Sequence, residues 1–452
     1  MDKKLNFREY IYLASMLFGL FFGAGNLIFP VFMGQLAGSN IWFSILGFLI
    51  TGVGLPLLGI VAMGISRSSG LYDLASRVNP LYSLFFTCAL YLTIGPFFAI
   101  PRTATVSFEV GIAPLIPESQ TSLWLGIFSF LFFLCVLLFS LKPSNILVYV
   151  GKILNPIFLL FLSILIIASI INPMGSLSDF PATGAYEYNS FFQGFIEGYN
   201  TMDALASLAF GIVVINAIKN LGVKDPKSIA LSTIKSGILS TSLMALIYAF
   251  LAIIGAQSLG ITSISANGGQ ALAIVSEHYF GRAGALLLAA TITVACLKTA
   301  VGLITSCSET FASIFKNSLS YRSYAILFCS ISFGIANVGL NNIISFSIPA
   351  LMFLYPLAIV LILLSLFHGA FKGDRRVYKI VTAFTLPAAI MDLIGALPEG
   401  LVGVLNLSLI IDWSKTYIPF YHIGMGWLVP SLVGLIIALL VSKINPNYQL
   451  DN

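Results

Sequence analysis

FFGAGNLIFP, residues 21–30, interrupts an apolar run that extends over residues 10–35. Counted as a helix from Tyr10, Gly23 lies ~20 Å along this run, near the middle of a hydrocarbon core that is ~30 Å thick. Glycine and asparagine are poor helix formers, and backbone groups released inside a membrane need partners or a polar cavity. The stretch therefore predicts a membrane helix that is broken at mid-depth, although close packing of small residues against another helix gives the same composition.

GFIEGYNTMDA, residues 194–204, has the same character within a second apolar run at 190–218. This run is the sixth along the chain, so the two interruptions occupy corresponding positions in two successive halves. Paired interruptions of this kind indicate a transporter whose solute binds at the midplane. The start of a half-helix presents free N–H groups to an anion, and freed carbonyl groups receive an ammonium or a metal cation. Such a site matches both charges of an α-amino acid.

The composition places the rest of the chain in a membrane. Of 452 residues, 58% are hydrophobic and 9% are charged, whereas a soluble domain has ~25% charged residues. Runs long enough to span a bilayer lie at about 10–35, 41–65, 80–110, 122–141, 145–171, 190–218, 228–258, 283–315, 323–340, 343–367, 377–397 and 422–442. We therefore expect an all-α integral membrane protein with about twelve transmembrane helices.

Basic residues occupy alternate loops between these runs. They are Lys3, Lys4, Arg8, Arg67, Arg77, Lys142, Lys152, Lys219, Lys224, Lys227, Lys235, Lys316, Arg322, Lys372, Arg375, Arg376, Lys379 and Lys443. The opposite loops keep little beyond Arg102, Arg282 and Lys415. The positive-inside rule then places both termini in the cytoplasm. The net charge of +5 comes from these basic loops. We expect the lipid bilayer as a partner and do not expect nucleic-acid binding.

Other function classes lack their sequence signals. The five cysteines fall inside apolar runs without metal-binding spacing, and an odd number disfavours a disulfide framework. No HExxH motif, Walker motif or serine–base constellation indicates an enzyme. A channel is the remaining alternative of another class, but it requires rings of polar residues along several spans, and the polar residues here are isolated. A carrier without a cofactor, driven by an ion or solute gradient, is the leading interpretation.

Several motifs together resemble the branched-chain amino acid:cation symporter family. They are FGAGNLIFP at 22–30, LTIGP at 92–96, IPRTA at 100–104, GYNTMDA at 198–204, ACLKTA at 295–300 and SIP at 347–349. The resemblance implies a LeuT-type inverted repeat of five plus five helices, with residues 1–172 and 173–370 as the two halves and 371–452 as two further helices. It also implies import of leucine, isoleucine and valine, usually with sodium, across the bacterial cytoplasmic membrane. Nothing in the sequence predicts an oligomeric state.

The two interruptions supply most of the predicted substrate-binding residues. These are Phe22, Gly23, Ala24, Gly25, Asn26, Tyr199, Thr201 and Asp203. Analogy with the fold adds four candidates for an apolar pocket, which are Tyr91, Ile94, Phe210 and Ala300. Asp203 either binds the substrate amine or a cation, or it braces the unwound segment. Asn26 either coordinates a cation or caps the second half of the first span, and Thr201 has the same two possible roles.

The resemblance also implies a cation site, and here the chain departs from the family pattern. Carbonyl groups of Gly19 and Phe22 would meet two hydroxyl residues on the eighth span, but this chain has Lys298-Thr299. An ionisable residue inside a membrane is a functional candidate, so we hypothesise that Lys298 replaces one sodium. Burial disfavours a charged amine, which leaves proton coupling or sodium-independent exchange as alternatives. A structural ion pair with Glu309 or Asp203 is the other interpretation.

Two further features give expectations about the outer face. Arg102 and Glu109 are seven residues apart on one helical face, which predicts an interfacial ion pair or part of an outer gate. The stretch Gly268 to Phe280 is expected to form a helix that lies against the outer surface.

Overall fold

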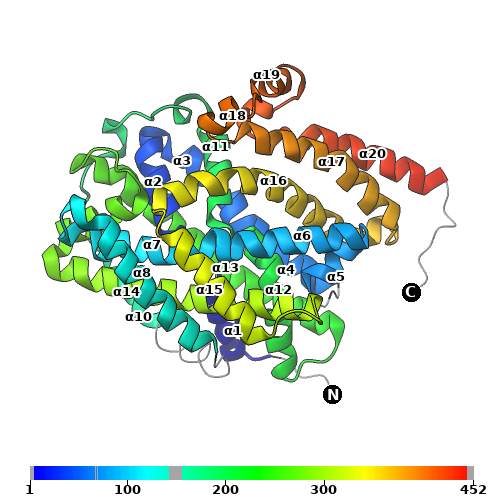
Figure 1. Ribbon diagram of the computed structural model, residues 1–452, viewed down its shortest axis with the longest axis horizontal. Coiled ribbons are helices and arrows are strands. Elements are labelled where there is room, and N and C mark those ends of the chain that lie inside the picture. The colour runs from blue at the N-terminus through cyan, green and yellow to red at the C-terminus, as the bar shows by residue number, and fades with distance from the viewer. Residues whose placement is uncertain (1–4, 67, 69, 142–154, 445–452) are drawn as a thin grey trace.

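The helices of this chain follow directly from its apolar runs, and the computed structural model describes them over residues 5–66, 68, 70–141 and 155–444. In these ranges all regular structure is helical (Figure 1), which confirms the predicted all-α class. Five of the basic residues used for orientation lie outside the described residues, namely Lys3, Lys4, Arg67, Lys142 and Lys152.

Each predicted run corresponds to a helical segment. The segments are α1 (Phe7–Phe21) with α2 (Ala24–Ala37), α3 (Ile41–Leu49) with α4 (Leu55–Ser66), α6 (Pro80–Leu92) with α7 (Ala99–Gly111), α8 (Thr121–Ser140), α10 (Asn155–Ile171), α11 (Tyr186–Glu197) with α12 (Asp203–Asn220), α13 (Pro226–Gln257), α14 (Gly268–Ile314), α15 (Tyr321–Ala336), α16 (Leu340–Leu366), α17 (Arg375–Gly395) and α20 (Leu428–Ile444). Within the described residues, seven helical stretches are long and apolar enough to cross a membrane, or eight with one bent pair. The count of twelve therefore stays a prediction.

Among the described residues, the first, second, third and sixth spans are irregular near their middles, the second through a π-helical turn, η2 (Ile50–Gly54). The first is divided between α1 and α2, and the sixth passes through a 3-10 segment, η8 (Gly198–Thr201). The third contains a π-helical turn, η3 (Thr93–Phe97), in which Gly95 leaves helical geometry at φ −95° and ψ −125°. Both interruptions predicted from the sequence are therefore present, and the third span is also interrupted before α7.

Small residues bring pairs of helices into backbone contact on either side of the breaks. A Cβ atom on Gly34 of α2 would collide with the carbonyl oxygen of Ala252 in α13, and one on Gly255 of α13 would collide with that of Val31. A Cβ on Gly47 of α3 would meet the backbone of α11 in the same way. Close packing through glycine therefore occurs in this chain, at positions away from the first interruption.

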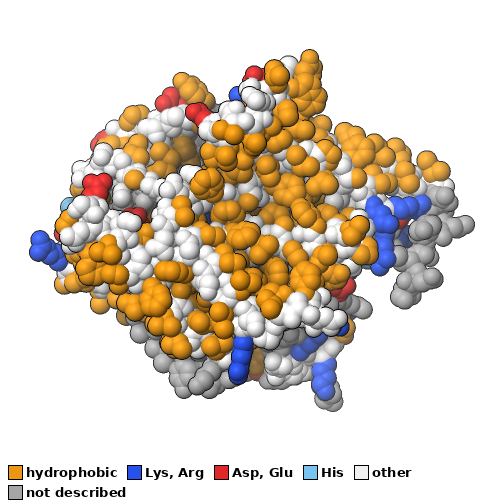
Figure 2. Space-filling view, in the orientation of Figure 1, with side chains coloured by type: hydrophobic (Ala, Val, Ile, Leu, Met, Phe, Trp, Pro, Cys, Tyr) orange, Lys and Arg blue, Asp and Glu red, His pale blue; other side chains and the backbone are white. Residues whose placement is uncertain are grey.

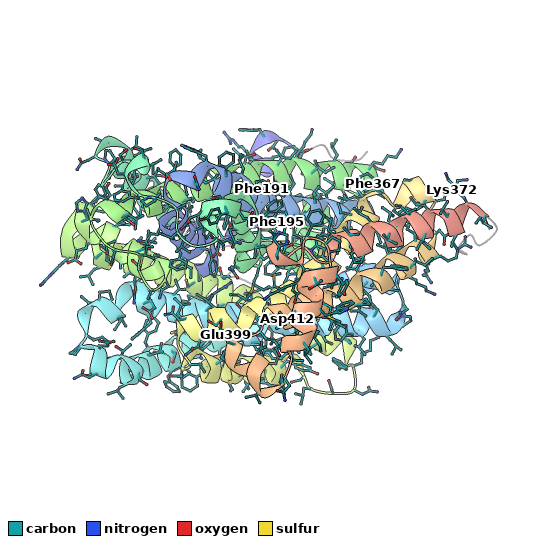
Figure 3. The ribbon with its side chains drawn as sticks, turned by 90° about the horizontal axis from the view of Figure 1, so that it is seen from above. Phe191, Phe195, Phe367, Lys372, Glu399 and Asp412 are labelled. Carbon is teal, nitrogen blue, oxygen red and sulfur yellow. The ribbon has the colours of Figure 1, made fainter. Side chains whose placement is uncertain are left out.

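The predicted outer helix at Gly268 to Phe280 is the first part of α14. It ends where Gly281 adopts φ +61° and ψ −166°, a conformation that favours glycine. Between the last two spans lie two short helices, α18 (Glu399–Val404) and α19 (Ser408–Tyr417). Figure 1 places these helices at the upper edge of the molecule, and Figure 3, seen from above, shows their Glu399 and Asp412 apart from Phe367 and Lys372, which lie toward the right.

The last two spans, α17 and α20, pack against each other and join the bundle through α16 (Figure 1). The exposed surface is rich in apolar side chains, including those of Leu131 on α8 and Ile436 on α20. Figure 2 shows this apolar surface across the middle of the molecule, with Lys and Arg side chains mainly at its right and lower edges. An apolar belt with charged edges is the surface expected of a membrane protein.

Candidate functional site

The first break releases polar backbone groups inside the bundle. Phe22 is extended, at φ −71° and ψ 100°, and Gly23 precedes the new helix. The Gly23 N–H donates to Asn26 Oδ1 over 2.8 Å instead of reaching the carbonyl of Gly19, its partner in a continuous helix. Because α2 begins at Ala24, the N–H groups of its first turn have no helical acceptor. The break thus presents N–H groups on one side and carbonyl groups on the other.

The second break is held by its own side chains. Met202 has a left-handed backbone, at φ 62° and ψ 11°, which is uncommon for a residue other than glycine. The Thr201 hydroxyl donates to the Gly198 carbonyl over 2.9 Å and accepts from the Asp203 N–H over 3.3 Å. Asp203 is therefore fixed as the first residue of α12, at the positive end of the helix dipole, where a carboxylate is favoured.

A buried triad of polar side chains joins the two breaks. Asn26 Nδ2 donates to Asp203 Oδ2 over 2.6 Å, and the Tyr248 hydroxyl of α13 donates to the same oxygen over 2.7 Å. Asn26 also contacts the Tyr248 hydroxyl. All three side chains are buried, so their polar groups depend on one another for hydrogen bonds. The sequence did not single out Tyr248, whose only signal is a hydroxyl in an apolar run.

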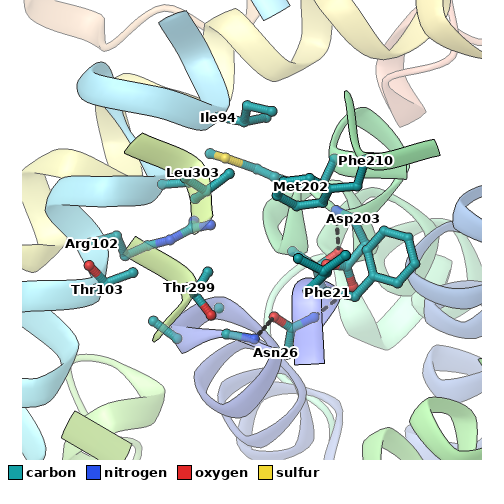
Figure 4. A pocket seen from close by; sticks show the side chains of 17 residues that line it. Phe21, Asn26, Ile94, Arg102, Thr103, Met202, Asp203, Phe210, Thr299 and Leu303 are labelled. Carbon is teal, nitrogen blue, oxygen red and sulfur yellow. Dashed lines mark hydrogen bonds between the residues drawn. The ribbon is translucent and has the colours of Figure 1, made fainter. Parts of the chain in front are cut away.

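A cavity of about 30 Å³ lies between the breaks and the spans that cover them (Figure 4). Nine of the predicted site residues line it, namely Gly23, Ala24, Gly25, Asn26, Ile94, Thr201, Asp203, Phe210 and Thr299. The lining residues that the sequence did not assign to the site are Leu20, Phe21, Ala99, Arg102, Thr103, Met202, Ala206 and Leu303. The cavity thus has a polar floor at the breaks and an apolar wall on the third, sixth and eighth spans.

The remaining predicted residues lie elsewhere. Tyr199 stacks on Tyr355 with ring centroids 3.9 Å apart. Phe22 stacks on Phe18 at 4.8 Å. Tyr91 points to a separate pocket and donates to the Ala209 carbonyl over 3.3 Å. None of these three rings lines the cavity. Gly19, Lys298 and Ala300 are also absent from the lining.

The eighth span meets the first break through Thr299. A Cβ atom added to Gly23 would lie 3.2 Å from Thr299 Oγ1, and this hydroxyl donates to the Ala295 carbonyl over 3.2 Å. The Thr299 side chain of α14 therefore lies against the first break. Lys298, the residue before Thr299 in α14, is buried as the sequence predicted, with 8% of its surface exposed.

Arg102 is the charged residue that the sequence placed wrongly. No ion pair joins it to Glu109 among the residues that the structure describes, so the predicted interfacial pair is absent. The side chain is 2% exposed, lines the cavity and packs its guanidinium 4.8 Å from the ring centroid of Phe29. Its Nη1 is buried, and within the described ranges it has no hydrogen-bond partner. The bend in η3 sits one turn before α7, on which Arg102 lies.

The chain is similar in sequence to known transport proteins over nearly its whole length. A family model described as branched-chain amino acid transport protein matches residues 6–445. The chain is 51% identical over 444 residues to the branched-chain amino acid permease BrnQ of Lactobacillus delbrueckii subsp. lactis, covering 98% of each chain. It is 43% identical over 442 residues to BrnQ of Bacillus subtilis, again covering 98% of each chain. It is 42% identical over 452 residues to BraB of the same organism, covering 100% of this chain and 99% of that one.

Solved structures show the same fold at low sequence identity. One is Mhp1, a nucleobase-cation-symport-1 family transporter, in a closed conformation with bromovinylhydantoin bound. Its TM-score is 0.59 at 13% identity, over 96% of this chain and 93% of that chain. The inward-facing conformation of Mhp1 gives a TM-score of 0.61 at 14% identity, over 98% and 96%. The chain therefore has the LeuT-type fold that the sequence motifs implied.

Proposed function

The chain belongs to the family of branched-chain amino acid transport proteins, and on that premise we propose that it imports leucine, isoleucine and valine in symport with a cation. The observation that carries this proposal is the cavity between two broken helices, which are joined by the bond from Asn26 to Asp203. Exposed backbone groups at such breaks are suited to a zwitterion. The membrane is the bacterial cytoplasmic membrane, with both termini in the cytoplasm. The two halves of the repeat are residues 1–172 and 173–370, followed by two helices in 371–452.

The composition of the cavity wall suits a branched aliphatic side chain, which the cavity of about 30 Å³ has to widen to admit. Ile94, Phe210 and Leu303 supply its apolar surface, and none of them carries a polar group that a hydrocarbon side chain would leave unpaired. One methylene changes binding by only ~1–3 kcal/mol in an apolar pocket. We therefore expect leucine, isoleucine and valine to compete for one site with affinities within about two orders of magnitude of each other.

Sodium is the first candidate for the coupled cation. The carbonyl groups of Gly19 and Phe22 belong to the first break, and the Thr299 hydroxyl lies near Gly23 on the neighbouring α14. Unwound carbonyl groups are common ligands of coupling ions in transporters.

Lys298 is the observation that favours a second mechanism of coupling. It is buried beside Thr299 on α14, where its ammonium can take the place of a sodium ion. In that mechanism the carrier runs on protons or exchanges amino acids without sodium. Lys298→Thr is then expected to create or strengthen a dependence on sodium. Uptake that is strictly sodium-dependent in the wild type and unchanged in Lys298→Thr would reject this role.

Reconstituted proteoliposomes test the whole proposal. Uptake of radiolabelled leucine is measured with a sodium gradient alone, a proton gradient alone and neither. Saturable uptake that unlabelled isoleucine and valine inhibit supports the carrier. Flux that is linear in leucine concentration, or is the same in empty liposomes, contradicts it. The gradient that accelerates uptake identifies the coupling ion, and uptake that needs only unlabelled leucine inside identifies an exchanger.

A further inference from the structure

The cavity holds one cationic and one anionic side chain, and they do not pair. Arg102 enters it from α7 and Asp203 faces it from the start of α12 (Figure 4). No salt bridge joins them among the described residues. Asp203 is instead bound by Asn26 and Tyr248. The two charges therefore remain available to a ligand that carries both signs.

Arg102 is the less satisfied of the two. Only 2% of the residue is exposed, and its Nη1 is buried with no acceptor in the described part of the chain. The contact with Phe29, at 4.8 Å from guanidinium carbon to ring centroid, stabilises one face of the cation but accepts no hydrogen bond. A buried guanidinium with an unused N–H is costly unless an acceptor arrives. The planar fork of arginine matches a carboxylate in particular.

The start of α2 lies beside the same guanidinium. A Cβ atom on Gly25 would come within 3.1 Å of Arg102 Nη2, so the missing side chain is what lets the backbone approach. The first-turn N–H groups of α2 have no helical acceptor and carry the positive end of the helix dipole. Two sources of N–H donors, one from the backbone and one from a side chain, thus converge on one point of the cavity.

We infer that Arg102 binds the carboxylate of the transported amino acid together with the first turn of α2, leaving the ammonium to the Asp203 side of the cavity. This inference rests on the proposed function, and it assigns to a named side chain the discrimination between an amino acid and an amine. The packing of the guanidinium on Phe29 sets the orientation of the fork. If Arg102 had a purely structural role, its substitution would weaken the binding of leucine and of an analogue without the carboxylate equally.

The test compares leucine with L-leucinamide, which keeps the ammonium and the side chain but lacks the carboxylate. Affinities are measured by competition against radiolabelled leucine, and by ligand-induced thermal stabilisation, for purified wild-type protein and Arg102→Gln. The matched control is Arg282→Gln, which removes an exposed arginine from α14. Loss of a charged hydrogen bond typically weakens binding by about 10- to 100-fold. Arg102→Gln should lose that much affinity for leucine and less than about threefold for leucinamide, and Arg282→Gln should change neither.

Arg102→Lys is the second variant, because it keeps the charge and volume but loses the fork. It should retain an intermediate preference for leucine over leucinamide. A preference that persists in Arg102→Gln, or an equal loss of both ligands in both Arg102 variants, overturns the inference. Wild-type protein that does not bind leucine would overturn the proposed function as well, so the two failures are distinguishable.

Discussion

Asn26 and Asp203 are separated by 177 residues in sequence and joined by a hydrogen bond of 2.6 Å between Nδ2 and Oδ2. The bond joins α2, the half-helix that follows the first break, to the first residue of α12, which follows the second break. Because Asn26 Oδ1 also accepts from the Gly23 N–H, a single amide both caps α2 and holds α12. Of the two roles predicted for Asn26, the structure shows the capping role.

Asn26→Ala should reduce leucine uptake by about tenfold or more, since it leaves the buried Gly23 N–H without its acceptor, at ~1–3 kcal/mol, and removes one of the two donors to Asp203. Initial rates in proteoliposomes measure the effect. Asn342→Ala is the matched control, because that amide donates to the Val338 carbonyl on the exposed side of α16. Equal rates for Asn26→Ala and wild type would contradict the bridging role.

Tyr248→Phe removes one hydroxyl and keeps the ring. We expect a loss of ~1–3 kcal/mol in stability or leucine binding, because Asp203 is left with one donor fewer in a buried site. Thermal unfolding in detergent and leucine binding together report it. Tyr279→Phe, which loses a hydroxyl bonded to the Asn172 carbonyl in an exposed position, should cost less. A larger loss in Tyr279→Phe would contradict this account of the triad.

Gly34→Ala should destabilise the protein by ~1–3 kcal/mol, because the new methyl group collides with the α13 backbone at Ala252 and overpacking costs about that much. Gly334→Ala is the control. It lies within α15 with nothing inside 4 Å of the new Cβ, so it should be neutral or raise the stability by up to ~1 kcal/mol through helix propensity. The apparent melting temperature should therefore fall in Gly34→Ala and stay unchanged or rise in Gly334→Ala.

His368 gives the protein a dependence on pH at the end of α16. Burial, and then the Arg77 guanidinium 3.2 Å away, lower the pKa of His368 below its usual value of 6.5. The unfolded chain then binds more protons than the folded one as the pH falls through 6.5, so stability is complete above that pH and decreases below it. Melting temperatures between pH 8 and pH 5 should show this loss, and His368→Gln should reduce it.

His422→Gln controls for the removal of a histidine outside the long spans and should leave the pH dependence as in the wild type. If His368→Gln keeps the full loss of stability at low pH, another group is responsible.

The breaks could be predicted from the sequence because they depend on local composition. Glycine and asparagine in the middle of an apolar run leave few other structures. The direction of individual side chains depends on packing between distant spans, and there the prediction was less complete. Tyr91 and Ile94 lie on the same span, yet only Ile94 lines the cavity.

Arg102 shows the same limit in sharper form. Its spacing of seven residues from Glu109 indicated an interfacial ion pair or part of an outer gate. Gly95 leaves helical geometry and Pro96 has no N–H to donate, so the span is interrupted before α7, where η3 packs on α14 and α15. Tyr248 could not be recognised for a related reason, since its partners come from α2 and α12.

The interlocked glycines of α2 and α13 have a consequence for movement. Their backbones touch without intervening side chains at Gly34 and Gly255, so neither helix can slide along the other without a collision. We therefore expect α2 and α13 to move together when access to the cavity changes, with the break at Phe22-Gly23 as the place where α2 turns relative to α1. Spin labels on α2 and α13 should accordingly keep a constant separation with and without leucine, while labels across α1 and α2 change theirs.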